Sequence, residues 1–170
     1  MFPKSSALAR RNLLILGLAA AVIALPMTAP TAFAYDESSK SALNVDKNSV
    51  ALRGYDPVAY FTAGKPTKGS TKFTAAHEGA IYQFATAANR DAFNGDPAKY
   101  APAFGGYCAM GAVFEKKLDG DPKLWRIVDG KLYVNVGAQA QKRWLEDVPG
   151  NITKANQSWP KIRDKAPNQL

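Results

Sequence analysis

The sequence predicts a small α+β domain, with one antiparallel sheet of two β-hairpins and several short helices packed on it. Two pairs of strand-like segments are each joined by a short turn containing Gly, and helical patterns follow each pair. The chain has 170 residues, of which 46% are hydrophobic and 21% charged. This composition is typical of one folded domain and excludes wholesale disorder.

The first half of the domain starts near residue 50. Asp56 is placed to cap a short helix from Pro57 to Thr62, because Pro suits the first helical position. The first hairpin joins residues 72–76 to 80–84, through a turn (77–79) whose Gly is expected at positive φ. A helix at 87–93, capped by Thr86, and one more helical turn at 97–100 complete this half.

The second hairpin has the stronger signal. Asp129-Gly130, a dipeptide that favours a type I′ turn, joins residues 124–128 to 131–135. A helical pattern then runs from Gly137 to about Val148 and is expected to stop at Pro149-Gly150, with a last helix over 151–160. No internal repeat is apparent.

The N-terminus has the three parts of an export signal. Lys4, Arg10 and Arg11 form a positive head, residues 13–25 are apolar, and Ala-Phe-Ala predicts cleavage after Ala34. The apolar run is shorter than the roughly 20 residues that span a bilayer, which argues against a retained membrane anchor. We therefore expect a periplasmic or secreted protein with no stable membrane insertion.

The paired arginines, followed by apolar residues, resemble the twin-arginine export motif. The pair lacks the usual Ser or Thr before it and the Lys after it, so the twin-arginine and general secretory routes both stay open. The predicted organisation is a signal at 1–34, a polar and poorly ordered leader at 35–49, the domain at 50–160 and a C-terminal tail at 161–170.

Charge and composition exclude two classes of function. The formal charge of +8 falls to +5 once the three basic residues of the signal are removed, leaving 19 basic against 14 acidic residues. The remaining basic residues are scattered, with short pairs at Lys116-Lys117 and Lys142-Arg143, so nucleic-acid binding is excluded. With one His and no nucleophile elbow, the chain also lacks a hydrolase triad, and we expect no enzyme.

The remaining chemistry lies in soft or borderline ligands. Cys108 and Met110 are two residues apart and His77 is the single imidazole; thiolate, thioether and imidazole together suit Cu(I). Two alternatives stay open. Cys108 and Met110 could simply fill the core, as these residue types commonly do, or the single thiol could be redox-reactive or dimerising in an oxidising compartment.

Several motifs of the mature chain resemble the YHS domain family, and its exported bacterial branch in particular. The resemblance covers about residues 50–159 and rests on three segments: Gly54 to Phe61, Tyr82 to Tyr100, and Gly105 to Ala109 together with Asp129 to Asn135. It implies a metal-binding habit through cysteines at positions that here are Ala59, Ala85 and Asn89. All three thiols are missing, so the usual site of the family does not carry over.

Two hypotheses follow. In the first, an exported, non-enzymatic domain binds a soft metal, copper, at a relocated site with Cys108 as primary ligand and Met110 or His77 assisting. In the second, the domain is a metal-free module whose former ligand positions have become packing residues. It would then hold a small ligand or a periplasmic protein partner in a pocket near three residues: Tyr55, Asp56 and Tyr107.

Overall fold

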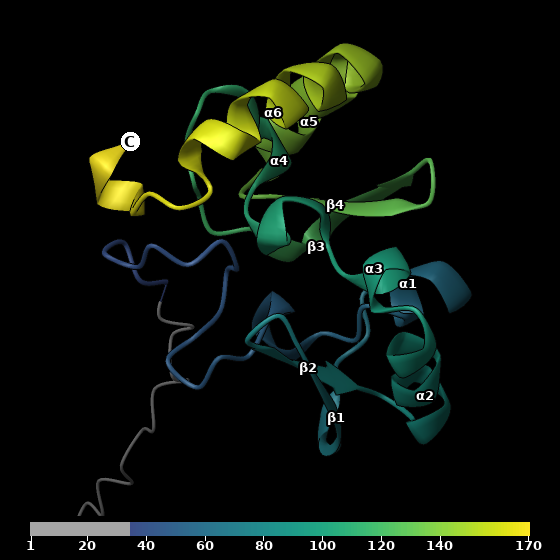
Figure 1. Cartoon of the computed structure of the whole chain (residues 1–170). Helices are drawn as coiled ribbons and strands as arrows, with labels where there is room; N and C mark the ends of the chain where they lie inside the picture. Colours follow the sequence, from purple (N-terminus) through teal and green to yellow (C-terminus); the bar gives the residue numbers. More distant parts are fainter. Residues whose placement is uncertain (1–34) are drawn as a thin grey trace, which may run out of the picture. The chain divides into compact units, whose positions relative to one another are not determined.

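The computed structural model describes residues 35–170 (Figure 1). The predicted export signal and its cleavage after Ala34 lie outside the described residues. Within them, two separate two-stranded antiparallel sheets and six α-helices confirm the α+β class. The first sheet pairs β1 (Ser70–His77) with β2 (Ala80–Phe84), and the second pairs β3 (Asp121–Val128) with β4 (Lys131–Asn135).

The prediction of a single sheet is wrong, because the two hairpins do not pair with each other. The outer edge of each second strand is already occupied by a neighbouring segment. Val50 forms a bridge to Ile81 of β2, and Cys108 forms a bridge to Val134 of β4. These bridges take up backbone groups at the sheet edges that would otherwise be open to pairing.

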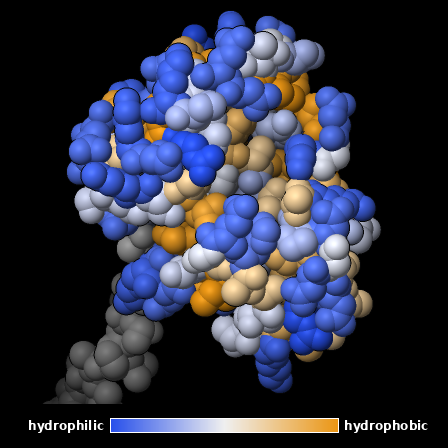
Figure 2. All heavy atoms as spheres, in the orientation of Figure 1, coloured by the Kyte–Doolittle hydropathy of each residue, from blue (hydrophilic) through white to orange (hydrophobic). Residues whose placement is uncertain are grey.

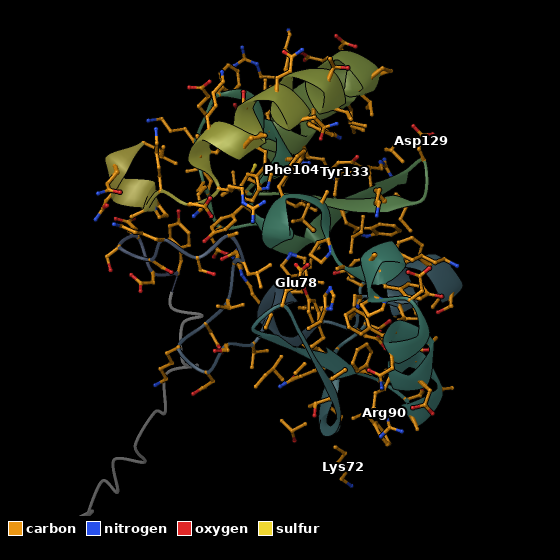
Figure 3. All side chains as sticks on the ribbon, in the orientation of Figure 1. Lys72, Glu78, Arg90, Phe104, Asp129 and Tyr133 are labelled. Carbon is orange, nitrogen blue, oxygen red and sulfur yellow. The ribbon has the colours of Figure 1, made fainter. Side chains whose placement is uncertain are left out.

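Both predicted turns are confirmed. Glu78 and Gly79 have φ values of 50° and 87°, and Asp129 and Gly130 have values of 48° and 72°. Positive φ at both central residues is the requirement of a type I′ turn, whose twist matches that of the flanking strands. Asp129 lies at the tip of its hairpin, away from the core (Figure 3).

Helices in the first half begin at residues that satisfy their free N–H groups. Helix α1 (Ala59–Thr62) follows Asp56, whose Oδ1 accepts from the N–H groups of Val58 and Ala59. Thr86 caps α2 (Ala87–Gly95), as predicted, and Asp96 caps α3 (Pro97–Tyr100). In the second half, helix α4 (Ala109–Val113) starts after Cys108, whose sulfur accepts from the Gly111 N–H.

The C-terminal helices differ from the prediction. Helix α5 (Ala138–Glu146) ends earlier, and α6 (Val148–Ile162) continues through Pro149-Gly150, which were expected to separate the two. Pro149 lies in the first turn of α6, where a missing N–H has no intrahelical partner to lose. Asp147 begins this helix, its Oδ1 accepting from the Gly150 N–H at 3.0 Å.

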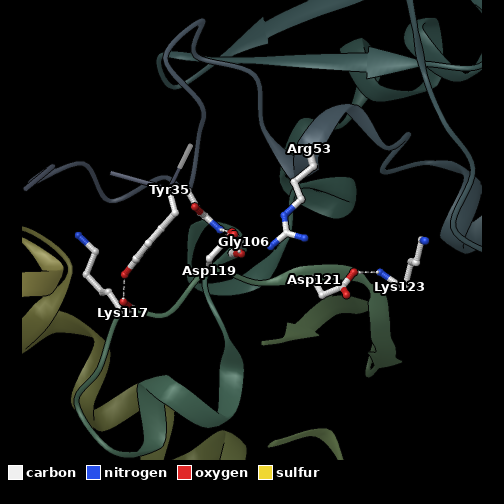
Figure 4. Close-up of polar contacts among 8 residues, drawn as sticks. Tyr35, Arg53, Gly106, Lys117, Asp119, Asp121 and Lys123 are labelled. Atoms are coloured by element: carbon white, nitrogen blue, oxygen red, sulfur yellow. Dashed lines mark hydrogen bonds and ion pairs between the residues drawn. The ribbon is translucent and has the colours of Figure 1, made fainter. Parts of the chain in front are cut away.

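The leader is packed against the domain, so the expectation of a poorly ordered leader is wrong. Tyr35 donates its hydroxyl proton to the carbonyl of Lys117 (Figure 4). The Lys117 ammonium donates in turn to the carbonyl of Ser41 at 2.7 Å. The Asn44 amide donates to the Asp119 carboxylate at 2.9 Å. A side chain at Gly105 would meet the Ala42 carbonyl at 1.9 Å, so glycine permits this close approach.

The core consists of packed aromatic and aliphatic side chains under each hairpin. Phe93 on α2 is fully buried against Tyr82 and Phe84 of β2, and Trp144 on α5 packs on Tyr133 of β4 with ring centroids 5.4 Å apart. Phe104 and Tyr133 lie side by side between the second hairpin and α6 (Figure 3). None of the helices in residues 35–170 has the length and apolar character needed to cross a bilayer.

Candidate functional site

The Cys108 thiol lies at the start of α4 and is inaccessible to solvent, with 0% exposure. Its Sγ accepts from the Gly111 N–H at 3.2 Å and donates to Asn135 Oδ1 at 3.6 Å. The same Asn135 oxygen accepts from the Met110 N–H at 3.1 Å, which fixes the orientation of the amide. Burial raises the pKa of Cys108 above its ordinary value. The thiol is therefore held in its neutral form at physiological pH.

A cavity of about 290 Å³ opens beside this thiol, between α4, the loop after it and α5. We call it the Cys108 cavity. Its walls are mostly apolar, with three polar side chains from the loop and α5. The lining residues are Cys108, Met110, Gly111, Phe114, Lys116, Leu118, Gln139, Ala140 and Arg143. Small apolar sites with a few placed polar groups are the usual form of ligand pockets.

Two cations, Lys116 and Arg143, line the Cys108 cavity, and neither has a counterion among the described residues 35–170. The Arg143 guanidinium lies 4.7 Å from the centroid of the Phe114 ring, a cation–π contact that leaves its N–H edges available. Among residues 35–170, neither the Arg143 nor the Lys116 side chain forms an ion pair or a hydrogen bond. The adjacent Glu115 pairs instead with Lys161 at 2.9 Å. Glu146, one turn further along α5, lines a separate surface hollow with Arg143.

The structure brings together only two of the three predicted metal ligands. Cys108 and Met110 both line the cavity, whereas His77 lies on β1 with its ring against Phe93, 5.9 Å between centroids. The His77 Nε2 is 3.9 Å from the Glu78 carboxylate. Within residues 35–170 no three His, Cys, Asp or Glu side chains are grouped so that they could hold a metal ion.

These donors do not fit a bound Cu(I) ion well. A thiolate is the strong soft ligand for copper, but burial disfavours the charged form of Cys108 and its proton already has an acceptor in Asn135. Met110 supplies one thioether, and no third soft donor lines the cavity. The copper site stays a prediction.

The three residues of the predicted ligand pocket do not line the Cys108 cavity. Asp56 is fully buried, and its carboxylate accepts four N–H groups at the start of α1 and α2. Tyr107 is buried and donates to the carbonyl of Ser41 at 3.1 Å, and the Lys68 ammonium lies 4.2 Å from the centroid of the Tyr55 ring. The donors to Asp56 are the N–H groups of Val58, Ala59 and Ala85 and the side-chain amide of Asn89.

This arrangement bears on the positions where the family resemblance implies cysteines. Ala59, Ala85 and Asn89 surround Asp56, with the Ala85 N–H 2.8 Å and the Asn89 Nδ2 2.6 Å from Oδ2. A carboxylate that accepts this many N–H groups is satisfied without a cation. All three positions thus donate an N–H group to one buried carboxylate.

Reasoning from sequence missed the residues that give the cavity its chemistry. Phe114, Gln139, Ala140, Lys116 and Arg143 come from two segments about 25 residues apart. Their only signal was the pair of short basic doublets, each of which contributes one residue to the lining. Hydrophobic side chains form small patches among hydrophilic ones on the face shown in Figure 2, and no such pattern is visible in the sequence.

Comparison of the chain with models of known protein families, with curated proteins and with solved structures gave no match. The resemblance to the YHS family therefore stays a prediction, and the case for a function rests on the geometry of the site.

Proposed function

We propose that this protein is an exported, non-enzymatic, metal-free binding module, and that the Cys108 cavity holds a small ligand with one anionic group and an apolar body. The observation that supports this is the pairing of apolar walls with two cations, Lys116 and Arg143, that have no counterion among residues 35–170. An anionic group would provide that counterion. The neutral thiol and the Met110 side chain would contact the apolar part.

The size of the cavity limits the ligand. At roughly 30 Å³ for a group the size of a water molecule, 290 Å³ accommodates about ten non-hydrogen atoms. A gain of about 0.4–0.7 kcal/mol per atom, in the lower part of the range for small ligands, gives a ligand of ten atoms about 4–7 kcal/mol. We expect dissociation constants between about 10 μM and 1 mM.

A series of probes with one chain length and different charge tests the proposal. Octanoate, 1-octanol and octylammonium have about the right size and differ in charge. Titration followed by amide chemical shifts should show octanoate binding about tenfold more tightly than octanol, with octylammonium weakest, because one charge-assisted contact contributes about 1.4 kcal/mol. The shifts should map to α4 and α5.

Matched variants separate a specific site from general attraction to a basic protein. Arg143→Gln and Lys116→Gln should each weaken octanoate binding, whereas Lys142→Gln, which removes an equal charge outside the cavity, should not. Equal affinity for the three probes, or equal loss in all three variants, would refute the proposal. Tight Cu(I) binding against a competing chelator, lost in Cys108→Ala, would favour the metal hypothesis instead.

A further inference from the structure

The two hairpins and the helices after them are built alike. The elements β1, β2 and α2 have the same lengths as β3, β4 and α5, respectively. Each of the three later elements begins 51 residues after its earlier counterpart. The strand pairing shifts at the same place in both hairpins. An aspartate, Asp96 or Asp147, ends both long helices with nearly the same backbone angles and caps the next one. We call residues 54–100 the first repeat and 106–151 the second repeat.

Asp56 and Cys108 occupy the same place in the two repeats. The Asp56 N–H donates to the carbonyl of Thr67 at 2.8 Å, and the Cys108 N–H donates to that of Leu118 at 2.9 Å. The Asp56 carboxylate and the Cys108 sulfur both accept N–H groups at the start of the following short helix. The residue that follows the second strand of each hairpin also acts on this position: the Ala85 N–H donates to Asp56 at 2.8 Å, and the Val136 backbone N–H acts to lower the pKa of Cys108 against the effect of burial.

The two repeats differ at the position that closes this site. In the first repeat the third residue of α2 is Asn89, whose Nδ2 lies 2.6 Å from the Asp56 carboxylate. The equivalent third residue of α5 is Ala140, which has no amide to offer and lines the Cys108 cavity. The cavity thus lies where the first repeat holds a side-chain amide.

We propose that the domain contains an internal duplication and that Ala140 is the residue that keeps the second repeat open to a ligand. An amide at this position would occupy the space beside the sulfur, as Asn89 does beside Asp56. The inference about the ligand rests on the proposed function, whereas the inference about the origin of the cavity rests on the repeat geometry alone. Ala140 therefore determines which of two equivalent sites admits a ligand.

The test combines structures of variants with octanoate titration. Ala140→Asn should place the new amide within hydrogen-bond distance of Cys108 Sγ in a crystal structure, close the cavity and weaken octanoate binding at least tenfold. Leu145→Asn introduces the same residue at an exposed position of the same helix and should change neither. Asn89→Ala should open a matching cavity beside Asp56, and this variant tests the inference if Ala140→Asn does not fold.

The outcomes separate the two proposals. If Ala140→Asn closes the cavity but wild type binds no octanoate, the duplication and the role of position 140 stand and the proposed ligand class fails. If Ala140→Asn binds octanoate as wild type does and its amide points to solvent, the role of Ala140 is overturned. If Asn89→Ala leaves the surroundings of Asp56 closed, the equivalence of the two sites is overturned as well.

Discussion

Replacing Lys117 by Met should release both ends of the described chain from the domain. Lys117 is 1% exposed, and its ammonium donates to three backbone carbonyls: Ser41 at 2.7 Å, Arg163 at 3.0 Å and Lys165 at 2.7 Å. It also lies 4.8 Å from the centroid of the Tyr107 ring. One buried cation therefore ties the leader and the segment after α6 to the same point, and methionine keeps the stem while removing every one of these bonds.

The magnitude follows from the number of bonds. A hydrogen bond from a charged donor contributes about 1.5 kcal/mol at the low end of its range, so three contribute about 4.5 kcal/mol, and the cation–π contact adds about 1 kcal/mol. Burial of the ammonium has a desolvation cost, which also lowers the pKa of Lys117. The methionine variant avoids this cost, and this offsets part of the loss in stability. We expect the free energy of unfolding to fall by about 3–4 kcal/mol.

Denaturant unfolding measures the total, and amide hydrogen exchange locates it. Exchange in Lys117→Met should accelerate most at residues 35–47 and 163–170, because these segments lose their shared anchor. Lys116→Met is the matched control, since the Lys116 ammonium forms no hydrogen bond within residues 35–170, and it should change stability by less than about 0.5 kcal/mol. A loss below 1 kcal/mol, or uniform acceleration of exchange, would refute the reasoning.

Three further predictions concern single positions. Burial raises the pKa of Cys108 above 9.0, so on raising the pH the folded state keeps the thiol proton longer than the unfolded chain does. Above pH 9 the free energy of unfolding of wild type should therefore fall by up to about 1.4 kcal/mol per pH unit relative to that of Cys108→Ala. Urea unfolding at several pH values measures this difference, and parallel pH dependences of the two proteins would contradict the prediction. Asp56→Asn should lower the free energy of unfolding by about 3–5 kcal/mol, because it places an amide group against four N–H donors. The control Asp96→Asn, at an exposed helix cap, should lower it by about 1 kcal/mol. Similar losses of stability in the two variants, measured by thermal unfolding, would count against the Asp56 network. Gly130→Ala should cost about 1 kcal/mol although nothing lies within 4 Å of the added methyl, because φ is 72°; an unchanged melting temperature would show that the turn relaxes.

The parts of the fold that the sequence predicted correctly depend on local chemistry. Asp129-Gly130 and Thr86 act through their own backbone and the next few residues, so neither needs a distant partner to be interpreted. The errors come from the opposite situation. Pro149-Gly150 is a common stop signal, but Asp147 caps a new helix immediately before it and makes the same dipeptide the first turn of α6.

The candidate site was beyond prediction for a similar reason. The Cys108 cavity depends on contact between α4 with its following loop and α5, and its most informative residue, Ala140, is small and common. The repeat that explains Ala140 is hidden in the sequence because the equivalent core positions carry different residues. Under the first hairpin the buried helix residue is Phe93, and under the second it is Trp144. The last residue of the second strand is Phe84 in the first hairpin and Asn135 in the second.

The residues that differ at equivalent positions of the two repeats are chemically consistent with one another. The Asp56 carboxylate is an acceptor and needs N–H donors around it, and Asn89 supplies one of its four. Phe84, which precedes the donor Ala85, has no polar side-chain atom that could repel the carboxylate. A neutral thiol has the opposite need, since it has a proton to donate. In the second repeat the residue equivalent to Phe84 is Asn135, whose oxygen accepts from Cys108.

With its proton so satisfied, the thiol does not require an amide at position 140, and alanine there carries no penalty. A buried carboxylate at 108 would require that amide, because an unpaired buried charge costs far more than an empty space of this size. The change from carboxylate to thiol is therefore what permits the second repeat to be open. The chemical role of Cys108 in this protein is then to allow a cavity beside it, a role that a small neutral side chain can fill without binding a metal.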